Sequence, residues 1–276
     1  AFMKGLVYTE MGRPNVLRVL DVKKPVPQRN QILVKVKASS INSTDFVQFE
    51  SAVKTGKVSA LFRIKEKLKD KKLGKVLGTE FAGIVAEVGA DVTGFNKGDA
   101  VYGIADGMLG AWAECVCADS NAVCAMPETL SFEEASAVPV AGTTALSAIR
   151  KAQIKPGQHV LVYGASGGVG QFTVQILKAY GATVTAVCST KNVDTAWKLG
   201  ADHVVDYKRE NVFANEKQYD AIIAVNGFNP TPGYSCVPAP GTDGKDCGAD
   251  RGFGGAALRK ESASGVAGLY RGRCHR

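Results

Sequence analysis

Hydrophobic and polar positions follow two different patterns along the chain, and the pattern changes near residue 130. Before that point, short apolar runs alternate with turns rich in glycine, proline and asparagine, which is typical of all-β regions. Strand-like runs occupy Lys4–Tyr8, Gln31–Lys37, Val101–Gly103 and Gly110–Ala118, and glycines divide Leu77–Gly89 into an expected strand pair. Residues 1–130 are therefore predicted to form a small, glycine-turned barrel.

From residue 131 onward, helical spacing and buried strands replace this pattern. Ser131 and Glu134 have the spacing of a capping box, which marks the start of a helix. His159–Tyr163 and Thr183–Val187 are short apolar runs of strand length. Between them, apolar residues recur at helical spacing, and Gly181 follows where a glycine often ends a helix; these apolar residues are Val169, Phe172, Ile176, Leu177 and Tyr180. This order predicts an α/β domain over residues 131–230.

The turn after the first of these strands favours a phosphate group. Gly164, Gly167 and Gly170 form G-x-x-G-x-x-G, a variant of the dinucleotide-binding fingerprint. Glycine lets a pyrophosphate approach the main chain, and a helix N-terminus offers N–H groups and partial positive charge. A tight turn that binds nothing is the alternative, but the flanking strands favour a dinucleotide site. Its predicted residues are Gly164, Ser166, Gly167, Gly168, Val169 and Gly170.

The end of the second strand indicates which dinucleotide is bound. NAD sites usually place an acidic residue there to bind the ribose 2′-hydroxyl. This chain has Ser189, Thr190 and Lys191 instead, and no acidic residue before Asp194. Two hydroxyls and a cation suit a 2′-phosphate, so NADPH is the predicted cofactor. The alternative for Lys191 is an ordinary surface lysine.

Composition excludes several classes of protein. The chain is 45% hydrophobic and 22% charged, which is ordinary for a globular protein. No apolar run reaches the length of about 18 residues that a membrane span needs, and no secretory signal is visible. Seven cysteines without a framework spacing indicate reduced thiols and a cytoplasmic location. Cys115 and Cys117 share one face of a predicted strand as small apolar residues, so no metal site is expected there.

The net charge of +8 is partly local, because Arg63–Lys75 is a basic, partly amphipathic predicted helix. A solvated helix face explains this run, and a patch for nucleic acid or an anionic membrane is the alternative. The run contains no aromatic residue to stack on a base, so a nucleic-acid partner is not expected.

The barrel, the α/β domain and several motifs together resemble the medium-chain dehydrogenase/reductase superfamily. The similarity is to its zinc-independent quinone oxidoreductase branch, which is zeta-crystallin-like, and it extends over residues 3–230. The stretches that carry it are Leu77–Val85, Gly98–Gly103, Gly142–Ala145, Gly164–Gly170 and Leu199–Tyr207. The resemblance implies a GroES-like domain over residues 1–130 and a Rossmann-type, doubly wound domain over residues 131–230 that is C-terminally incomplete.

The resemblance also implies a reaction without zinc. In the alcohol dehydrogenase branch, a zinc-binding cysteine lies near the position of Ser39–Asn42 and a histidine stands in place of Thr79. With both ligands missing, the implied reaction is hydride transfer from NADPH to a quinone or an α,β-unsaturated carbonyl. Val47 stands where quinone reductases often have tyrosine, which weakens the preference for quinones.

Several site residues follow from the resemblance alone. Asn42 and Thr144 would lie beside the nicotinamide, Tyr207 beside the adenosine phosphate, and Asn226 and Gly227 at the nicotinamide ribose. Asn42 would orient either the cofactor or the acceptor, whereas Asp45 is assigned a structural role. The alternatives are a loop-capping role for Asn42, a helix hydroxyl for Thr144 and a strand-end aromatic for Tyr207.

Residues 231–276 depart from the family pattern, because they hold ten glycines and few apolar residues. Moving the codons of Ala239–Gly248 forward by one nucleotide permits a Pro-Gly turn and a strand, so a frameshift and a natural divergent tail are both open. We expect this segment to be largely irregular and the family's homodimer interface to be missing.

The next sheet strand would then be a bare edge, and the chain would be aggregation-prone with weak or no activity. A second class of function also fits the sequence: a nucleotide-binding or RNA-interacting protein without turnover.

Overall fold

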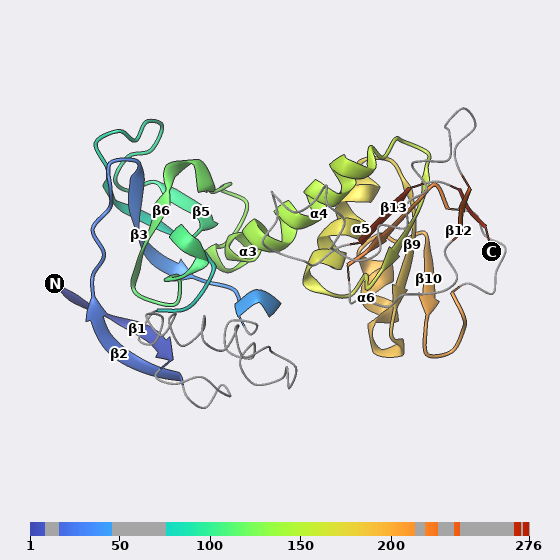
Figure 1. Ribbon diagram of the computed structural model, residues 1–276, viewed down its shortest axis with the longest axis horizontal. Coiled ribbons are helices and arrows are strands. Elements are labelled where there is room, and N and C mark those ends of the chain that lie inside the picture. The colour runs from blue at the N-terminus through green and yellow to red at the C-terminus, as the bar shows by residue number, and fades with distance from the viewer. Residues whose placement is uncertain are drawn as a thin grey trace, which may run out of the picture. The chain divides into compact units, whose positions relative to one another are not determined.

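The computed structural model describes residues 1–8, 17–45, 76–212 and 219–225, together with the backbone of three short strands in the C-terminal segment. The chain divides into two compact units, Ala1–Val140 and Ala141–Arg276 (Figure 1). The division falls at residue 140 and not at 130, because helix α3 (Phe132–Ser136) packs on strands of the first unit. Four features predicted from sequence lie outside the described residues: the basic run Arg63–Lys75, Val47, the pair Asn226 and Gly227, and most of residues 231–276.

The first unit is built on antiparallel strands, as its short apolar runs predict. Its five-stranded sheet has the order β6-β3-β4-β5-β7, and β1 and β2 form a separate pair. Ile32, Phe81 and Val116 are fully or almost fully buried in its core. The strands are β1 (Phe2–Tyr8), β2 (Leu17–Lys23), β3 (Gln31–Ala38), β4 (Glu80–Val88), β5 (Ala100–Ile104), β6 (Cys115–Asp119) and β7 (Val123–Ala125), with single turns η3 (Asp106–Met108) and η4 (Ser120–Ala122).

Two strand predictions in this unit need correction. Leu77–Gly89 does not form a strand pair, because Gly83 lies inside the single strand β4. A Cβ on Gly83 would lie 2.2 Å from the Lys35 carbonyl oxygen, so this glycine permits close approach to β3 and does not make a turn. The run Gly110–Ala118 is a strand only from Cys115 onward.

The second unit is a mainly parallel sheet with the order β10-β9-β8-β11-β13, which confirms the Rossmann-type prediction. Strands β8, β9, β10 and β11 are parallel to one another, and β13 joins the edge of β11 in the antiparallel direction. The elements are α4 (Val138–Ala152), β8 (His159–Tyr163), α5 (Gly168–Ala179), β9 (Thr183–Cys188), η5 (Thr190–Asn192), α6 (Val193–Lys198), β10 (His203–Asp206), β11 (Ala221–Ala224), β12 (Ser235–Val237), β13 (Gly268–Arg271) and β14 (Arg273–His275).

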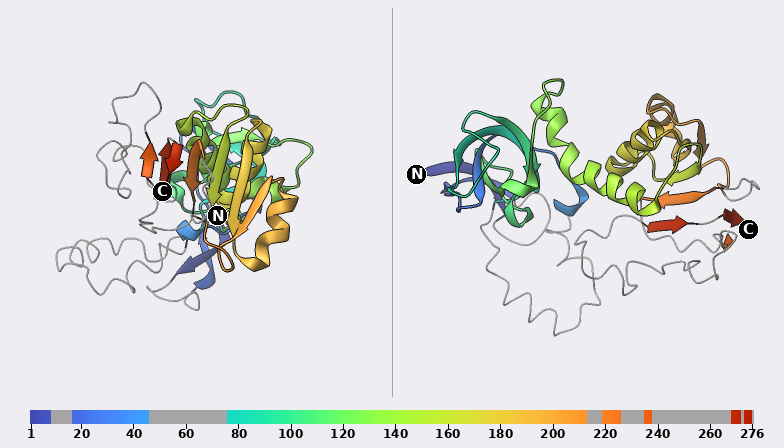
Figure 2. Two further views of the ribbon diagram at one scale, coloured as in Figure 1. Left: turned by 90° about the vertical axis from the view of Figure 1, so that its right-hand side faces the viewer. Right: turned by 90° about the horizontal axis from the view of Figure 1, so that it is seen from above.

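The expectation of a bare edge at β11 is wrong. Ala221 to Ala224 pair with Arg271 to Gly268, and the two strands run side by side in the right-hand view of Figure 2. Backbone pairing needs no apolar run, so a glycine-rich segment with few apolar residues still supplies a strand. Strands β12 and β14 form a further antiparallel pair in the same segment.

Helix α5 is where the spacing predicts it, but its buried face is displaced from the predicted stripe. Gly170, Thr173, Val174 and Leu177 are buried, whereas Tyr180 is 39% exposed. The small Gly170 faces inward because the helix begins so close to the preceding turn. Val169 and Ile176 flank this face as partly buried neighbours of the same core. Gly181 has a φ of +77°, which confirms the predicted glycine end of the helix.

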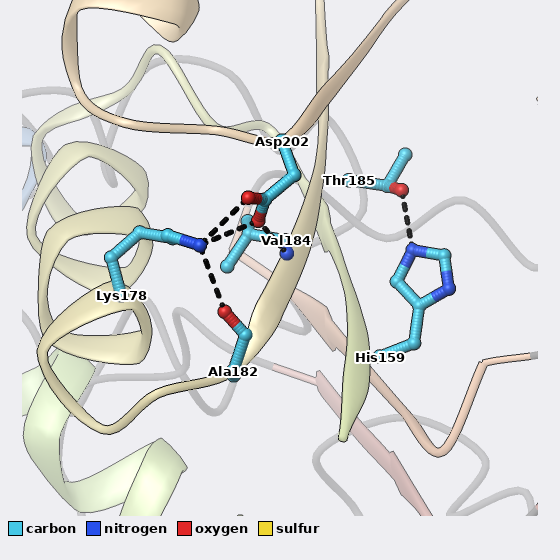
Figure 3. Close-up of polar contacts among 6 residues, drawn as sticks. All are labelled: His159, Lys178, Ala182, Val184, Thr185 and Asp202. Carbon is cyan, nitrogen blue, oxygen red and sulfur yellow. Dashed lines mark hydrogen bonds and ion pairs between the residues drawn. The ribbon is translucent and has the colours of Figure 1, made fainter. Parts of the chain in front are cut away.

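An ion pair fastens α5 to the sheet (Figure 3). Lys178 Nζ donates to both carboxylate oxygens of Asp202, at 2.8 and 2.7 Å, and to the Ala182 carbonyl oxygen at 3.1 Å. Asp202 also accepts a hydrogen bond from Val184 N at 2.7 Å. One carboxylate therefore connects the end of α5, the start of β9 and the turn before β10.

Within the described residues, no helix is both long enough and apolar enough to cross a membrane.

Candidate functional site

The glycine turn between β8 and α5 has the backbone geometry that a pyrophosphate site needs. Gly164 has a φ of +84°, a conformation that favours glycine. A Cβ on Gly170 would lie 2.2 Å from the Gly164 carbonyl oxygen, so only glycine fits there without a shift of the main chain. The turn folds back on the first turn of α5 as tightly as the G-x-x-G-x-x-G spacing predicts.

The first amides of α5 are available to an anion. Gly167 is the N-cap and supplies no side-chain acceptor, and the first turn of the helix contains no acidic residue. In an α-helix the N–H groups of Gly168, Val169 and Gly170 have no intrahelical acceptor. This donor set and the partial positive charge of the helix end fit the phosphates of a dinucleotide. The predicted residues Gly164 to Gly170 are thus brought together in one cradle.

The sheet topology places this cradle at a switch point. From β8 the chain proceeds outward to β9 and β10, and it then crosses to the other side of β8 to form β11. In open α/β sheets, ligands bind outside the carboxyl ends of the strands where the strand order reverses. Gly164 follows β8 directly and lies at that end of the sheet.

Asn192, which sequence reasoning missed, connects the glycine turn to the end of β9. Its Nδ2 donates to Ser166 Oγ at 3.0 Å and to Ser189 Oγ at 3.2 Å. This bridge brings the two halves of the predicted cofactor site together. The only signal in the sequence was its position one residue after Lys191.

The three residues predicted to bind a 2′-phosphate are not equivalent. The Thr190 side chain lies near the Asp206 carboxyl group, at the end of β10, and lowers its pKa. Ser189 Oγ accepts a hydrogen bond from Asn192 Nδ2, and the Lys191 side chain is exposed. All three residues stay predicted ligands of the 2′-phosphate.

Asp206 is a second residue that sequence reasoning missed. The Thr190 side chain is the largest influence on the pKa of its carboxyl group, and burial opposes it. The backbone N–H of Lys208 and the charges of Arg209 and Lys208 add to the effect of Thr190, and the net result holds the pKa of Asp206 below its ordinary value. The negative charge of Asp206 is therefore engaged by these neighbours.

Tyr207 lies directly after β10, at the end of the strand. Its backbone N–H donates to the Cys188 carbonyl oxygen at 3.1 Å, which ties it to the end of β9. The ring is 46% exposed and Lys208 Nζ lies 5.8 Å from its centroid. Tyr163, Tyr207 and Lys208 line an open hollow of about 420 Å³ at the carboxyl ends of β8 and β10. An exposed ring beside a cation fits the predicted contact with an adenosine phosphate.

Asn42 belongs to a closed polar cluster in the first unit. Its Nδ2 donates to Glu80 Oε1 at 2.7 Å and to Ser40 Oγ at 3.2 Å. Ser40 Oγ donates to Glu80 Oε1, and Val140 N donates to Glu80 Oε2 at 2.6 Å. Glu80, which sequence reasoning did not assign to the site, is therefore its central acceptor.

Asp45 has the structural role that the sequence suggests. It is 1% exposed and accepts hydrogen bonds from Asn42 N and from Thr79 Oγ1, each at 2.7 Å. These bonds fix the backbone of the loop that carries Asn42.

The second candidate catalytic residue, Thr144, is half-buried on α4. It lies in the second unit, whereas Asn42 lies in the first.

The positions where alcohol dehydrogenases bind zinc hold no cysteine or histidine. Ser39 Oγ donates to the Glu80 carbonyl oxygen at 2.6 Å, and the other polar side chains bond to one another as described above. Hydroxyls, an amide and one carboxylate do not make a zinc site of the usual nitrogen and sulfur type.

The two cysteines of β6 are partly buried thiols. Cys115 and Cys117 do share one face of the strand. Burial, with a smaller contribution from Asp106, raises the pKa of the Cys117 thiol to about 11. This thiol is therefore protonated at neutral pH.

Two family models match the chain. The alcohol dehydrogenase GroES-like domain matches residues 28–128, and the zinc-binding dehydrogenase domain matches residues 168–231. Their order agrees with the two units of the structure.

Individual relatives support the same family. The chain is 34% identical to tomato 2-methylene-furan-3-one reductase, a match that covers 80% of this chain and 56% of the relative. It is 33% identical to the Arabidopsis thaliana chloroplast envelope quinone oxidoreductase homolog, over 82% of this chain and 69% of the relative. The chain spans somewhat more than half the length of several of its curated relatives.

Solved structures agree with these matches. The quinone oxidoreductase of Coxiella burnetii aligns with a TM-score of 0.73 and 35% identity, over 83% of this chain and 70% of that one. The Escherichia coli quinone oxidoreductase complexed with NADPH aligns with a TM-score of 0.64 and 29% identity, over 76% and 60% of the two chains. Fold, motifs and relatives lead to one conclusion: the chain belongs to the medium-chain dehydrogenase/reductase superfamily, in its quinone oxidoreductase-like branch.

Proposed function

We propose that this protein is an NADPH-dependent reductase that transfers a hydride to a quinone or an α,β-unsaturated carbonyl. The observation that carries the proposal is the turn from Gly164 to Gly170, where the main chain and the N-terminus of α5 form a cradle for a pyrophosphate. The names of the relatives support the acceptor class, because they include a quinone oxidoreductase, an alkenal/one oxidoreductase and a furanone reductase.

Different residues would have different roles in binding the cofactor and in hydride transfer. Bound NADPH would supply the hydride. The turn would hold the pyrophosphate, Ser189, Thr190 and Lys191 would hold the 2′-phosphate, and Asn42 and Thr144 would orient the reacting groups. Positioning of this kind is the main contribution that a protein makes to hydride transfer from a cofactor.

We propose further that the reaction needs no zinc ion. The matched domain is called zinc-binding, but the side chains at Ser39–Asn42 and Thr79–Glu80 do not fit zinc. Hydride transfer to a conjugated carbonyl needs stabilisation of the developing charge on oxygen, which hydrogen-bond donors supply without a metal.

The test measures oxidation of NADPH and NADH with a panel of quinones and enones, in the unmodified protein and in Lys191→Ala. We expect Lys191→Ala to weaken NADPH binding by roughly tenfold or more, because a charge-assisted bond to the 2′-phosphate is worth about 1.5–3 kcal/mol. NADH binding should stay nearly unchanged.

Lys155→Ala is the matched control, because Lys155 is also exposed but lies before the amino end of β8. Equal losses for NADPH and NADH in Lys191→Ala would refute the assignment of the 2′-phosphate site. Tight NADPH binding without turnover of any acceptor would instead support a nucleotide-binding protein without catalysis.

A further inference from the structure

We propose that Glu80 fixes the orientation of the Asn42 amide, with its N–H₂ end held at the Glu80 carboxylate and its carbonyl oxygen turned away. Glu80 then acts as a positioning residue, and the Asn42 carbonyl oxygen is the group that accepts a hydrogen bond from a donor of the cofactor. This inference rests on the proposed function for the identity of the ligand, but the orientation of the amide can be tested without it.

The burial of Glu80 is the first step of the argument. Its side chain is 0% exposed, and a buried carboxylate is stable only where hydrogen-bond donors surround it. Among the described residues, three donors do so: Ser40 Oγ and Asn42 Nδ2 at Oε1, and Val140 N at Oε2. All three are neutral groups, so each contact depends on a donated proton.

The hydrogen-bonding groups of Glu80 and Asn42 decide which end of the amide faces the carboxylate. A carboxylate accepts hydrogen bonds and cannot donate them, and an asparagine amide has a donor end and an acceptor end. The donor end of Asn42 must therefore face Glu80. The same Nδ2 lies 3.2 Å from Ser40 Oγ, whose own proton goes to Glu80. The donor end of Asn42 is thus held by the cluster. Oδ1, to which none of the described residues donates, is the end turned away from the carboxylate.

The consequence concerns the chemistry of Asn42. A carbonyl oxygen binds an amide N–H₂ or a hydroxyl, and a nicotinamide nucleoside carries both kinds of donor. It cannot stabilise negative charge that develops on the oxygen of a quinone or enone, because that oxygen needs a donor. Of the two roles that the resemblance leaves open for Asn42, this orientation favours contact with the cofactor.

Glu80 has a structural task as well, which the experiment must separate from this one. Val140 is the third residue of α4, Pro139 has no N–H, and the first turn of α4 contains no acidic residue. Glu80 Oε2 therefore supplies the acceptor and the negative charge at the start of this helix. A large truncation at Glu80 would disturb both tasks at once.

Exchanging the donor and the acceptor between positions 80 and 42 separates the orientation of Asn42 from the capping of α4. Glu80→Gln keeps the shape of the side chain but replaces one accepting oxygen by an N–H₂ group. This N–H₂ group must then face another donor, either Asn42 Nδ2 or Val140 N. Asn42→Asp alone sets two carboxylates against each other. In the double variant, the introduced glutamine would accept from Val140 N and donate to the introduced aspartate. That aspartate would still present an oxygen to the ligand.

We expect each single variant to lower kcat/KM for NADPH about tenfold or more, which is the effect of one unpaired buried polar group. The double variant should recover most of that loss. A double variant as poor as Asn42→Asp alone would overturn the proposal.

A second readout does not depend on turnover. In the full chain, the side-chain N–H₂ resonances of Asn42, assigned by their loss in Asn42→Asp, should exchange slowly with water and should shift in Glu80→Gln. Ser39→Ala is the control, because the Ser39 hydroxyl bonds to main-chain oxygens of Glu80 and Ser40 and not to the Glu80 carboxylate. It should leave these resonances in place even if stability falls.

Rapid exchange of the Asn42 amide in the unmodified protein would contradict the proposal, even if the single variants do not fold. If this amide is protected but no acceptor oxidises NADPH, the proposed function fails while the role of Glu80 stands.

Discussion

At the scale of single residues, the cofactor cradle depends on the lack of a side chain at Gly170. Gly170 is buried in the first turn of α5 and lies against the main chain of Gly164. Gly168, two positions earlier, is exposed, and the nearest atom to an added Cβ would be the Ala141 Cβ at 3.9 Å. A side chain at Gly170 would clash with the main chain, whereas a side chain at Gly168 would not. Alanine substitution at the two positions should therefore have different effects.

We predict that Gly170→Ala destabilises the protein by about 1–3 kcal/mol, the usual cost of overpacking, and weakens NADPH binding. Its Cβ would lie 2.2 Å from the Gly164 carbonyl oxygen, and a backbone atom cannot move away as a flexible side chain can. Gly168→Ala should be neutral or slightly stabilising, because alanine favours a helix. Thermal unfolding with a fluorescence titration of NADPH would check both, and equal stability of the two variants would contradict the prediction.

At the scale of elements, Asp202 fastens a helix and two strands through one carboxylate. Burial alone would raise its pKa, but hydrogen bonds from Lys178 and Val184 N, and the charges of Lys178 and His203, lower it below its ordinary value. The side chain is 36% exposed, so solvent screens much of the attraction to Lys178. The expected contribution to stability is therefore modest and depends on pH.

We predict that Asp202→Asn lowers the free energy of unfolding by up to about 1 kcal/mol at neutral pH. A carboxylate whose pKa is lowered by folding stabilises the folded state above its unfolded pKa of about 3.9, and this stability is lost as the pH falls through the folded pKa. The difference between Asp202→Asn and the unmodified protein should be constant from about pH 5 to 8 and shrink below about pH 4. Denaturant titrations across this range would measure it, and a difference that grows on acidification would exclude the ion pair as its cause.

At the scale of the whole molecule, each unit has its own core, and the sheet of the second unit is completed from a distant segment. β11 lies between β8 and β13, which come from opposite sides of it in the sequence. In such a strand, successive N–H groups alternate between the two neighbours. Half of the ladder of β11 therefore depends on β13.

We predict that all four amides of Ala221–Ala224 exchange slowly with solvent, and that removal of residues 268–276 accelerates exchange at alternate positions only. Residue-resolved hydrogen exchange would show this pattern, with β8 as the internal control because both strands that pair with it, β9 and β11, remain in the shortened chain. Rapid exchange at alternate β11 positions in the full chain would mean that β13 does not pair with β11 in solution.

The sequence predicted those parts of the structure that depend on local pattern. The turn from Gly164 to Gly170 and the capping box at Ser131 follow from spacing, and both are found in the structure. The Glu80 cluster could not be predicted, because its members are brought together only by the fold.

The two wrong expectations about strands have physical causes. Gly83 makes a close approach between strands and not a turn, which a sequence pattern does not distinguish. The pairing of β13 uses main-chain hydrogen bonds, which leave little trace in the hydrophobic pattern. Asn192 and Asp206 were missed because a single polar residue at a strand end gives no periodic signal.

The position of β13 in the sequence has a consequence for how the second unit folds. β8, α5 and β9 are consecutive, so they can associate through short loops, whereas β13 must close a long loop back to β11. Contacts that are distant in sequence form slowly, because the entropy of loop closure is lost before the pairing energy is gained. The strand–turn–helix unit that carries the cofactor cradle should therefore be assembled early, and the edge of β11 should stay open to other chains until the last strand arrives.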